Sequence, residues 1–157
     1  MTGNKTLIIV STLIIFSLLS CKNNSMYNNE VTIPEHIWQT SDTLHFDTNI
    51  SDDQNYYNLF LTVDAQDNYL TDNLWLFIKS QSPSGNILND TAMLYITNEK
   101  GKWFGKKHGH TVKNKFLYKA HILFPEKGTY RFIIRHGMRK NDLPRVSSVG
   151  LSIEKDK

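Results

Sequence analysis

Cys21 is the residue whose type and position predict the most definite chemistry in this sequence. It ends the sequence Leu18-Leu19-Ser20-Cys21, in which a branched apolar residue stands three positions before the cysteine and a small residue directly before it. This pattern is typical of a lipobox, at which a bacterial export signal is cleaved and the cysteine becomes acylated. We therefore predict that Cys21 carries a lipid. An ordinary signal peptide with a chance cysteine is the alternative.

The residues before Cys21 have the composition of an export signal. Lys5 supplies a positive charge, and residues 7–19 form an apolar run. That run is shorter than the ~20 residues that a helix needs to cross a bilayer, which favours a removable signal over a membrane span. Residues 1–20 are predicted to be a cleaved lipoprotein signal peptide.

Acylation of Cys21 would leave the mature chain without a free thiol, because the sequence contains one cysteine. A disulfide framework and a cysteine-based metal or catalytic site are then excluded. The residues after the cysteine are strongly polar, so residues 21–30 are predicted to be a lipidated flexible tether. They contain no acidic run of the kind that directs lipoproteins to the cell surface. We expect an outer-membrane lipoprotein that faces the periplasm.

The pair His108 and His110 is the most metal-like element, because two imidazoles separated by a glycine can point to one side. His121 and His136 are further nitrogen ligands that could complete a set. Lys106 and the lysine after it, however, place positive charge beside the pair, and no carboxylate lies nearby in the sequence to act as a ligand. No metal site is predicted.

Other catalytic patterns are equally poorly supported. The sequence Ser82-Pro83-Ser84-Gly85 has the composition of a turn, and it lacks the strand-turn-helix setting of an activated serine. Aspartate-rich segments at residues 52–53 and 64–67 are typical of solvated turns between strands. The sequence has no glycine-rich phosphate loop. We therefore predict no catalytic residue, no cofactor and no enzyme.

Composition limits the folded part and its partners. The chain of 157 residues has 18 basic and 15 acidic residues, a net charge of +3 with neutral histidines. This near-balance argues against a nucleic-acid partner. Residues 31–157 have the size of one domain. Charge is unevenly distributed, since residues 42–72 hold seven acidic residues and no Lys or Arg, whereas residues 100–119 hold seven Lys and no acid.

Period-two alternation of apolar and polar residues dominates this domain, and no stretch shows a convincing amphipathic helix. Turn residues separate the alternating segments. The pattern predicts an all-β fold, an antiparallel β-sandwich of about eight strands. Residues 74–78 are apolar at every position and are predicted to form a central strand covered on both faces. Strands are expected within residues 44–50, 57–63, 74–78, 92–97, 116–118, 122–124, 130–134 and 149–153.

Tyr130 stands at the start of one expected strand, after Gly128 and Thr129. This arrangement resembles the tyrosine corner of sandwich folds, in which the phenol bonds to nearby backbone. A core aromatic residue without that bond is the alternative.

Aromatic residues support an alternative function. Trp75 lies in an apolar run and is expected in the core, whereas Trp38 and Trp103 lie near turns, where they could be exposed. Together with Tyr56, Tyr57, Tyr69 and Tyr95 they are numerous enough to form a stacking platform. A lipid-anchored glycan-binding β-sandwich is therefore the alternative function.

A candidate partner-binding face combines aromatic residues, glycines and basic charge within residues 101–110. Its proposed contact residues are Lys102, Trp103, Phe104, Lys106 and Lys107. A partner protein would meet the aromatic side chains and be oriented by the lysines. In the other interpretation the tryptophan packs under its own hairpin and the lysines only solvate it.

Several motifs together resemble one known family. They follow one another in an order and spacing that cover nearly the whole domain. They are Trp38, Asp42-Thr43-Leu44-His45-Phe46, Tyr57-Asn58-Leu59, Tyr69, Asn73-Leu74-Trp75-Leu76, Gly101-Lys102-Trp103-Phe104-Gly105, Phe124-Pro125, Gly128-Thr129-Tyr130, Met138-Arg139, Leu143 and Val149-Gly150-Leu151. The sequence resembles the gliding-motility lipoprotein GldH family of Bacteroidetes.

This resemblance implies a component of the gliding machinery of the cell envelope, which in that phylum is coupled to type IX protein secretion. The expected partners are the membrane, through the lipid on Cys21, and other gliding or secretion proteins of the envelope. The implied role is a non-enzymatic protein-interaction module.

Overall fold

The computed structural model describes residues 25–156, so the predicted signal peptide and Cys21 lie outside the described residues. Within this range the chain is almost entirely extended. The elements are β1 (Ser25–Thr32), η1 (Pro34–His36), β2 (Ile37–Gln39), β3 (Leu44–Ile50), β4 (Tyr56–Gln66), β5 (Asn73–Gln81), β6 (Ile87–Tyr95), β7 (Lys106–His108), β8 (Thr111–Leu123), β9 (Gly128–His136), β10 (Asp142–Pro144) and β11 (Val146–Lys155).

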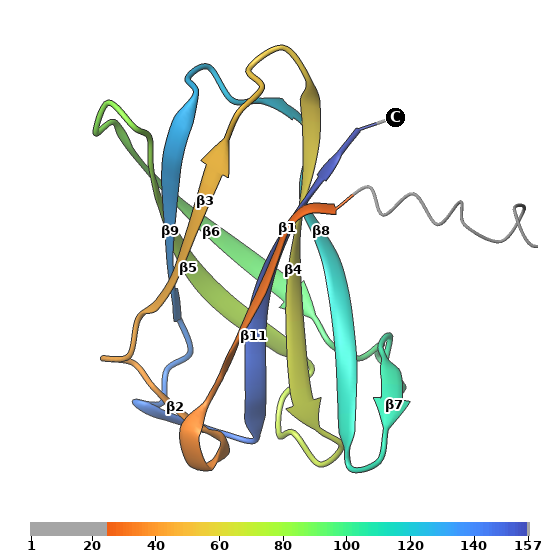
Figure 1. The fold of residues 1–157 in the computed structure, drawn as a ribbon. Helices are drawn as coiled ribbons and strands as arrows, with labels where there is room; N and C mark the ends of the chain where they lie inside the picture. The colour runs from red at the N-terminus through yellow and green to blue at the C-terminus, as the bar shows by residue number, and fades with distance from the viewer. Residues whose placement is uncertain (1–24, 157) are drawn as a thin grey trace, which may run out of the picture.

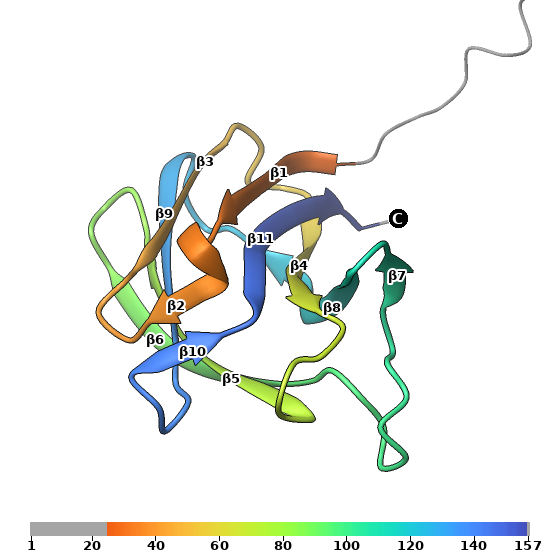
Figure 2. The same ribbon diagram turned by 90° about the horizontal axis from the view of Figure 1, so that it is seen from below.

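Two antiparallel sheets pack face to face, which confirms the predicted β-sandwich (Figures 1 and 2). One sheet has the strand order β1-β11-β4-β8-β7 and the other has the order β3-β9-β5-β6. A two-stranded sheet of β10 and β2 lies at one end. The strands β2, β7 and β10 have three residues each, too few to show an alternating pattern in the sequence.

The core forms from the inward side chains of alternating strands. In β3 each apolar position is buried and each intervening residue is exposed, and β4 alternates in a similar way. Trp38 of β2 is fully buried, although its position near a turn could have exposed it. Its indole Nε1 donates a hydrogen bond to the Asp42 carbonyl at 3.0 Å. This bond lets the large ring close one end of the core without leaving a buried donor unpaired.

The first strand corrects the predicted tether. Residues 21–30 were expected to be flexible and the domain to begin at residue 31, but β1 begins at Ser25 and pairs antiparallel with β11. Backbone hydrogen bonds to a neighbouring strand do not require apolar side chains, which is why the polar composition was misleading. Met26, Tyr27 and Val31 also pack against the core.

The strand covered on both faces is β11, not β5. In β5 the residues Trp75 and Phe77 are 40% and 39% exposed, so the apolar run has one buried face and one outer face. In β11 every residue from 146 to 153 is buried. Its outward positions are small, and at Gly150 an added Cβ would lie 2.3 Å from Thr62 Oγ1 and 2.9 Å from the Asn29 carbonyl oxygen. Neighbouring side chains can therefore close over this strand.

Tyr130 behaves as a tyrosine corner. The side chain is buried, and its phenol oxygen accepts a hydrogen bond from the Glu126 backbone N–H at 3.1 Å. This bond joins the turn before β9 to the start of that strand.

Two edges of the four-stranded sheet differ in how they meet the other sheet. At one edge β3 lies beside β1 (Figures 1 and 2). At the other edge β6 faces β8, and Lys119 Nζ lies 2.6 Å from Asp90 Oδ2 across the gap. The Tyr118 hydroxyl donates a second bond, of 2.9 Å, to the same carboxylate oxygen. We call the first junction the closed seam and the second the open seam.

Candidate partner-binding surface

The five predicted contact residues lie in the segment of the chain that connects β6 to β8. Thr97 and Trp103 form an isolated antiparallel bridge, and the Phe104 N–H donates to the Ile96 carbonyl at 3.0 Å. Lys106 and Lys107 begin β7, which pairs with the start of β8. The segment is therefore ordered by backbone bonds at both ends.

Its two aromatic residues have different environments. Trp103 is half-buried and packs against the core, as in the interpretation that placed it under its own hairpin. Phe104 is 63% exposed. Only the phenyl ring is therefore fully available to a partner.

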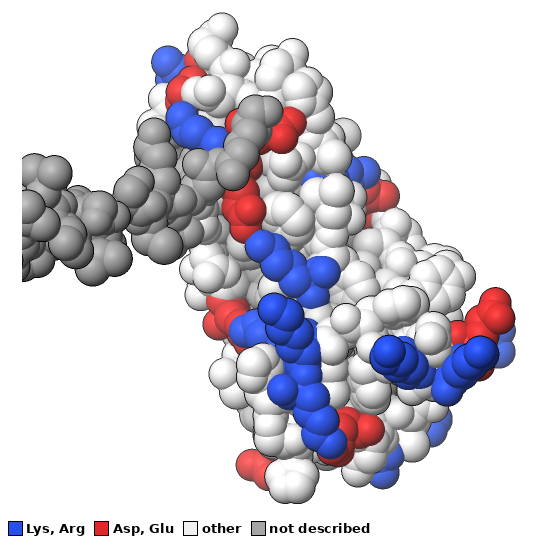
Figure 3. Space-filling view, turned by 90° about the vertical axis from the view of Figure 1, so that its right-hand side faces the viewer, with Lys and Arg blue, Asp and Glu red and all other residues white. Residues whose placement is uncertain are grey.

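The lysines also divide into two groups. Lys107 Nζ lies 2.7 Å from Asp67 Oδ2, and this contact holds the pKa of Asp67 below its ordinary value. Among the described residues no carboxylate lies within ion-pair distance of Lys102 or Lys106. Figure 3 shows basic side chains gathered in a band on the side of the molecule formed by β8 and β7. Lys102 and Lys106 are the two contact lysines whose charge is not already balanced.

Gly105 sets the direction of the chain after the hairpin that the Thr97–Trp103 bridge closes. An added Cβ there would lie 2.4 Å from the Lys113 carbonyl oxygen and 2.5 Å from Asn114 Oδ1. No side chain fits in that space, so glycine allows the backbone to pass directly against β8. The ring of Phe104 consequently projects beside the gap between β6 and β8.

A groove occupies this gap, with a volume of about 420 Å³. Its floor includes Asn114, which is 1% exposed and whose Oδ1 has no hydrogen-bond partner among the described residues. A buried acceptor without a partner is uncommon in folded proteins and calls for a donor. The groove is lined by Met93, Leu94, Tyr95, Phe104, Gly105, Asn114, Lys115, Phe116 and Leu117.

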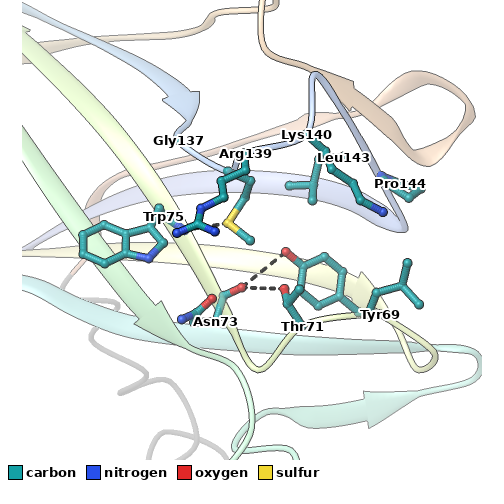
Figure 4. A pocket seen from close by; sticks show the side chains of 11 residues that line it. Tyr69, Thr71, Asn73, Trp75, Gly137, Arg139, Lys140, Leu143 and Pro144 are labelled. Atoms are coloured by element: carbon teal, nitrogen blue, oxygen red, sulfur yellow. Dashed lines mark hydrogen bonds between the residues drawn. The ribbon is translucent and has the colours of Figure 1, made fainter.

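A second cavity, of about 500 Å³, lies between the start of β5 and the loop that follows β9 (Figure 4). The hydroxyls of Tyr69 and Thr71 donate to the Asn73 carbonyl at 3.5 and 2.8 Å and order one wall. Trp75 and Arg139 line the cavity as well. Trp75 was predicted in the core, because the sequence of β5 does not reveal which face is outside. The sequence also gave no signal that residues 137–144 would fold against it.

The histidines and aspartates considered for metal binding are dispersed. Within residues 25–156 no group of three or more His, Cys, Asp or Glu side chains could hold a metal ion. His121 Nδ1 contacts Asp156 Oδ2 at 2.6 Å and its ring stacks on Tyr56, whereas His136 is buried beside Trp38. Residues 82–85 form the expected turn, with the Gly85 N–H donating to the Ser82 carbonyl at 2.9 Å.

Residues 25–156 also contain no helix long and apolar enough to cross a membrane.

Comparison with known proteins decides the family. The family model described as GldH lipoprotein matches residues 25–153, which is nearly all of the described domain. The chain belongs to the GldH lipoprotein family. The match begins at the first residue of β1 and so agrees with a domain that starts before residue 31.

Two relatives of the family are similar over almost their whole length. The gliding motility lipoprotein GldH homolog of Christiangramia forsetii is 30% identical over 155 residues, which cover 94% of this chain and 93% of the relative. The gliding motility lipoprotein GldH of Flavobacterium johnsoniae is 26% identical over 144 residues, which cover 87% of this chain and 89% of the relative.

Among solved structures, the Yersinia pseudotuberculosis-derived mitogen aligns with 83% of this chain and 87% of its own. Its sequence identity is 8% and the TM-score is 0.37, a similarity too distant to bear on function.

Proposed function

We propose that this GldH family member is a lipid-anchored component of the gliding-motility machinery and acts as a protein-interaction module, without catalysis. The observation that carries the proposal is the joint occurrence of the family match and an ordered, exposed surface around Phe104. Relatives that match nearly the whole chain are named gliding motility lipoproteins. A β-sandwich with one apolar and basic surface is suited to binding rather than to chemistry.

The proposed anchor is the lipid on Cys21, with the domain attached to the outer membrane and facing the periplasm. The Leu18-Leu19-Ser20-Cys21 sequence supports acylation. Because a multiply acylated cysteine holds a protein durably at a bilayer, the domain would remain concentrated near other anchored proteins. Coupling to type IX secretion is part of the same proposal, and weak contacts with secretion proteins would then be sufficient.

Affinity isolation from gently solubilised membranes tests the anchor. The full-length lipoprotein is expected to bring gliding or secretion proteins with it, and a Cys21→Ser form is expected to recover less of each. Equal recovery by both forms would contradict the anchoring role. Recovery of neither class of protein by the acylated form would contradict the assignment to this machinery.

Charge reversal tests the surface. Lys106 has no acidic partner within residues 25–156, so Lys106→Glu is expected to weaken co-isolation without changing the melting temperature. Lys107→Glu would also place a second negative charge beside Asp67, and its effect on stability must be measured in parallel. Lys79→Glu, on the outer face of β5, is the matched control. Co-isolation that is equal in Lys106→Glu and Lys79→Glu would exclude this surface.

Glycan binding is a second candidate because of the cavity in Figure 4, where the exposed ring of Trp75 lies near Asn73 and Arg139. An aromatic face with nearby polar groups is a common arrangement for sugar recognition. Titration with cell-wall or capsular sugars would change the tryptophan fluorescence, and Trp75→Phe would remove the change. No change with any of these sugars would exclude this function.

A further inference from the structure

β6 has one unpaired edge. It lies at the end of its sheet and pairs with β5 in a continuous register without a bulge. The Ser82 N–H donates to the Asn86 carbonyl at 2.9 Å, and this bond fixes the alternation along the ladder. Since an antiparallel ladder bonds through every second residue, the N–H and C=O groups of Asn89, Thr91, Met93 and Tyr95 point away from β5.

This edge is protected over only part of its length. The Thr91 N–H donates to Asp90 Oδ1 at 2.7 Å, and the same carboxyl group contacts Lys119. An aspartate of this kind prevents pairing with another strand at its own position. No strand of the described residues pairs with the edge at Met93 or Tyr95.

Residues 103–104 pair with the chain just after β6, but the pairing does not continue along β6 itself. Trp103 bridges Thr97, and the Phe104 N–H bonds to Ile96, but at Gly105 the backbone turns away towards β8. The space next to Met93 and Tyr95 is therefore left as the groove described above.

Four apolar side chains around this space are accessible. Met93 and Tyr95 are 36% and 56% exposed, and Phe104 and Leu117 are 63% and 56% exposed. Natural sheets usually protect edges with charged residues, proline or bulges, so an open apolar edge is an aggregation hazard unless something covers it.

We propose that an extended segment of a partner protein adds as a strand to β6 at residues 92–95, with apolar side chains in the groove and carboxylates beside Lys102 and Lys106. This proposal rests on the proposed partner-binding function and names the chemistry of the segment that the surface receives. Backbone hydrogen bonds to Met93 and Tyr95 supply the pairing, and the apolar pockets select alternate side chains.

Charge favours a partner over a second copy of this chain. Two copies paired through β6 would bring together two sets of the same unbalanced lysines, and like charges at an interface oppose association. An acidic segment would instead neutralise Lys102 and Lys106.

A synthetic peptide tests the pairing directly on the folded lipoprotein. The probe is a blocked heptapeptide that alternates glutamate and valine. It is expected to slow amide hydrogen exchange at Met93 and Tyr95, while the exchange of amides in β3 stays unchanged. Two control peptides are used, one N-methylated at alternate residues and one with lysine in place of glutamate, and each should bind about tenfold more weakly. Equal binding of the N-methylated peptide, or no protection at millimolar concentrations of the first peptide, would overturn the proposal.

A variant tests the same contact from the protein side. Met93→Pro removes an N–H that points away from β5, and proline is tolerated at such edge positions. It should weaken peptide binding about tenfold, whereas Met93→Ala keeps the N–H and should lose less. Equal loss in both variants would overturn strand addition in favour of side-chain contact alone. The N-methylated peptide gives the same information on the unaltered protein if Met93→Pro does not fold.

Failure of this inference can be separated from failure of the proposed function. If Lys106→Glu reduces co-isolation from membranes and Met93→Pro does not, the surface is correct and strand addition is wrong. If neither variant reduces co-isolation relative to Lys79→Glu, the partner surface itself is wrong.

Discussion

The two seams, where the edge strands β3 and β6 of one sheet meet the other sheet, differ in how much apolar surface they expose. At the closed seam, β3 keeps strict alternation, and its outward Asp47 is held by two bonds from Arg131 at 2.9 and 3.0 Å. At the open seam, Met93, Tyr95 and Phe104 expose apolar surface to solvent. Both seams border the same sheet. Exposed apolar side chains at the open seam contribute little to the core, which is why we place the proposed partner-binding surface there.

Core truncation gives the largest expected contrast between the seams. Phe46 of β3 is fully buried, so Phe46→Ala should lower the free energy of unfolding by about 3–5 kcal/mol. Phe104→Ala removes the same ring from an exposed position and should change stability by less than about 0.5 kcal/mol. Urea denaturation of both variants measures the difference. Similar losses would show that the open seam is part of the core.

A smaller loss of stability is expected from a change in β11 where it pairs with β1, the strand that lies beside β3 at the closed seam. Gly150→Ala places a methyl group against Thr62 and the backbone of Asn29, and overpacking of this kind should cost about 1–3 kcal/mol. Ser152→Ala is the matched control on the same strand, because its buried hydroxyl has no hydrogen-bond partner among the described residues. That control should be nearly neutral. If Gly150→Ala is also neutral in thermal unfolding, then β1 does not close over β11 as described.

Acid should lower the stability of the domain through protonation of His136, the last residue of β9. Burial holds the pKa of His136 below its ordinary value, and the Met138 N–H donates to Nδ1 at 3.4 Å, which requires a neutral ring. The unfolded state binds a proton near pH 6.5 and the folded state resists it, so stability falls as the pH decreases below about 6.5 towards the folded pKa. Denaturation between pH 7.5 and 5 should show this slope, and His136→Gln should reduce it. An unchanged slope in the variant would assign the acid sensitivity to other groups.

A small effect on stability is expected from the ion pair that spans the open seam. The Lys119 contact lowers the pKa of Asp90, yet both side chains are substantially exposed. Asp90→Asn should therefore change the free energy of unfolding by no more than about 0.2–1 kcal/mol. Amide exchange at Thr91 should accelerate because that N–H loses its charged acceptor. Unchanged exchange would mean that Asp90 does not protect this edge.

The sequence was sufficient for the fold class because alternation is local. Segments such as β3, β4 and β9 each alternate so regularly that one buried face is evident without knowledge of the neighbours. Tyr130 could be considered for a tyrosine corner because the signal, Gly128-Thr129-Tyr130 before a strand, is also local, but the bond from the Glu126 N–H decides it over a plain core aromatic. By contrast, β1 is polar and is held by backbone bonds to β11, a strand that comes at the other end of the chain.

The candidate site was predictable only in part, because exposure depends on distant packing. The segment around Phe104 was found from its lysines, glycines and aromatics, but its relation to Met93 and Tyr95 depends on how β6 and β8 meet. Trp75 was predicted in the core but is exposed, and Trp38, which lies near a turn, is fully buried. Trp75 is surrounded by apolar neighbours in sequence, yet among residues 25–156 no further sheet packs on that face of β5. Trp38 lies in a polar stretch that folds over the end of the core.

Photocross-linking in cells most directly tests whether the open seam is the partner-binding surface. A photoreactive amino acid would replace Tyr95 at the open seam or Asn49, an exposed residue of β3, in the full-length lipoprotein. The account predicts that Tyr95 gives cross-links to a gliding or secretion protein of the envelope and that Asn49 gives far fewer. It also predicts that Lys106→Glu reduces the cross-links from Tyr95. Equal cross-linking from both positions, or cross-linking from Asn49 alone, would contradict it.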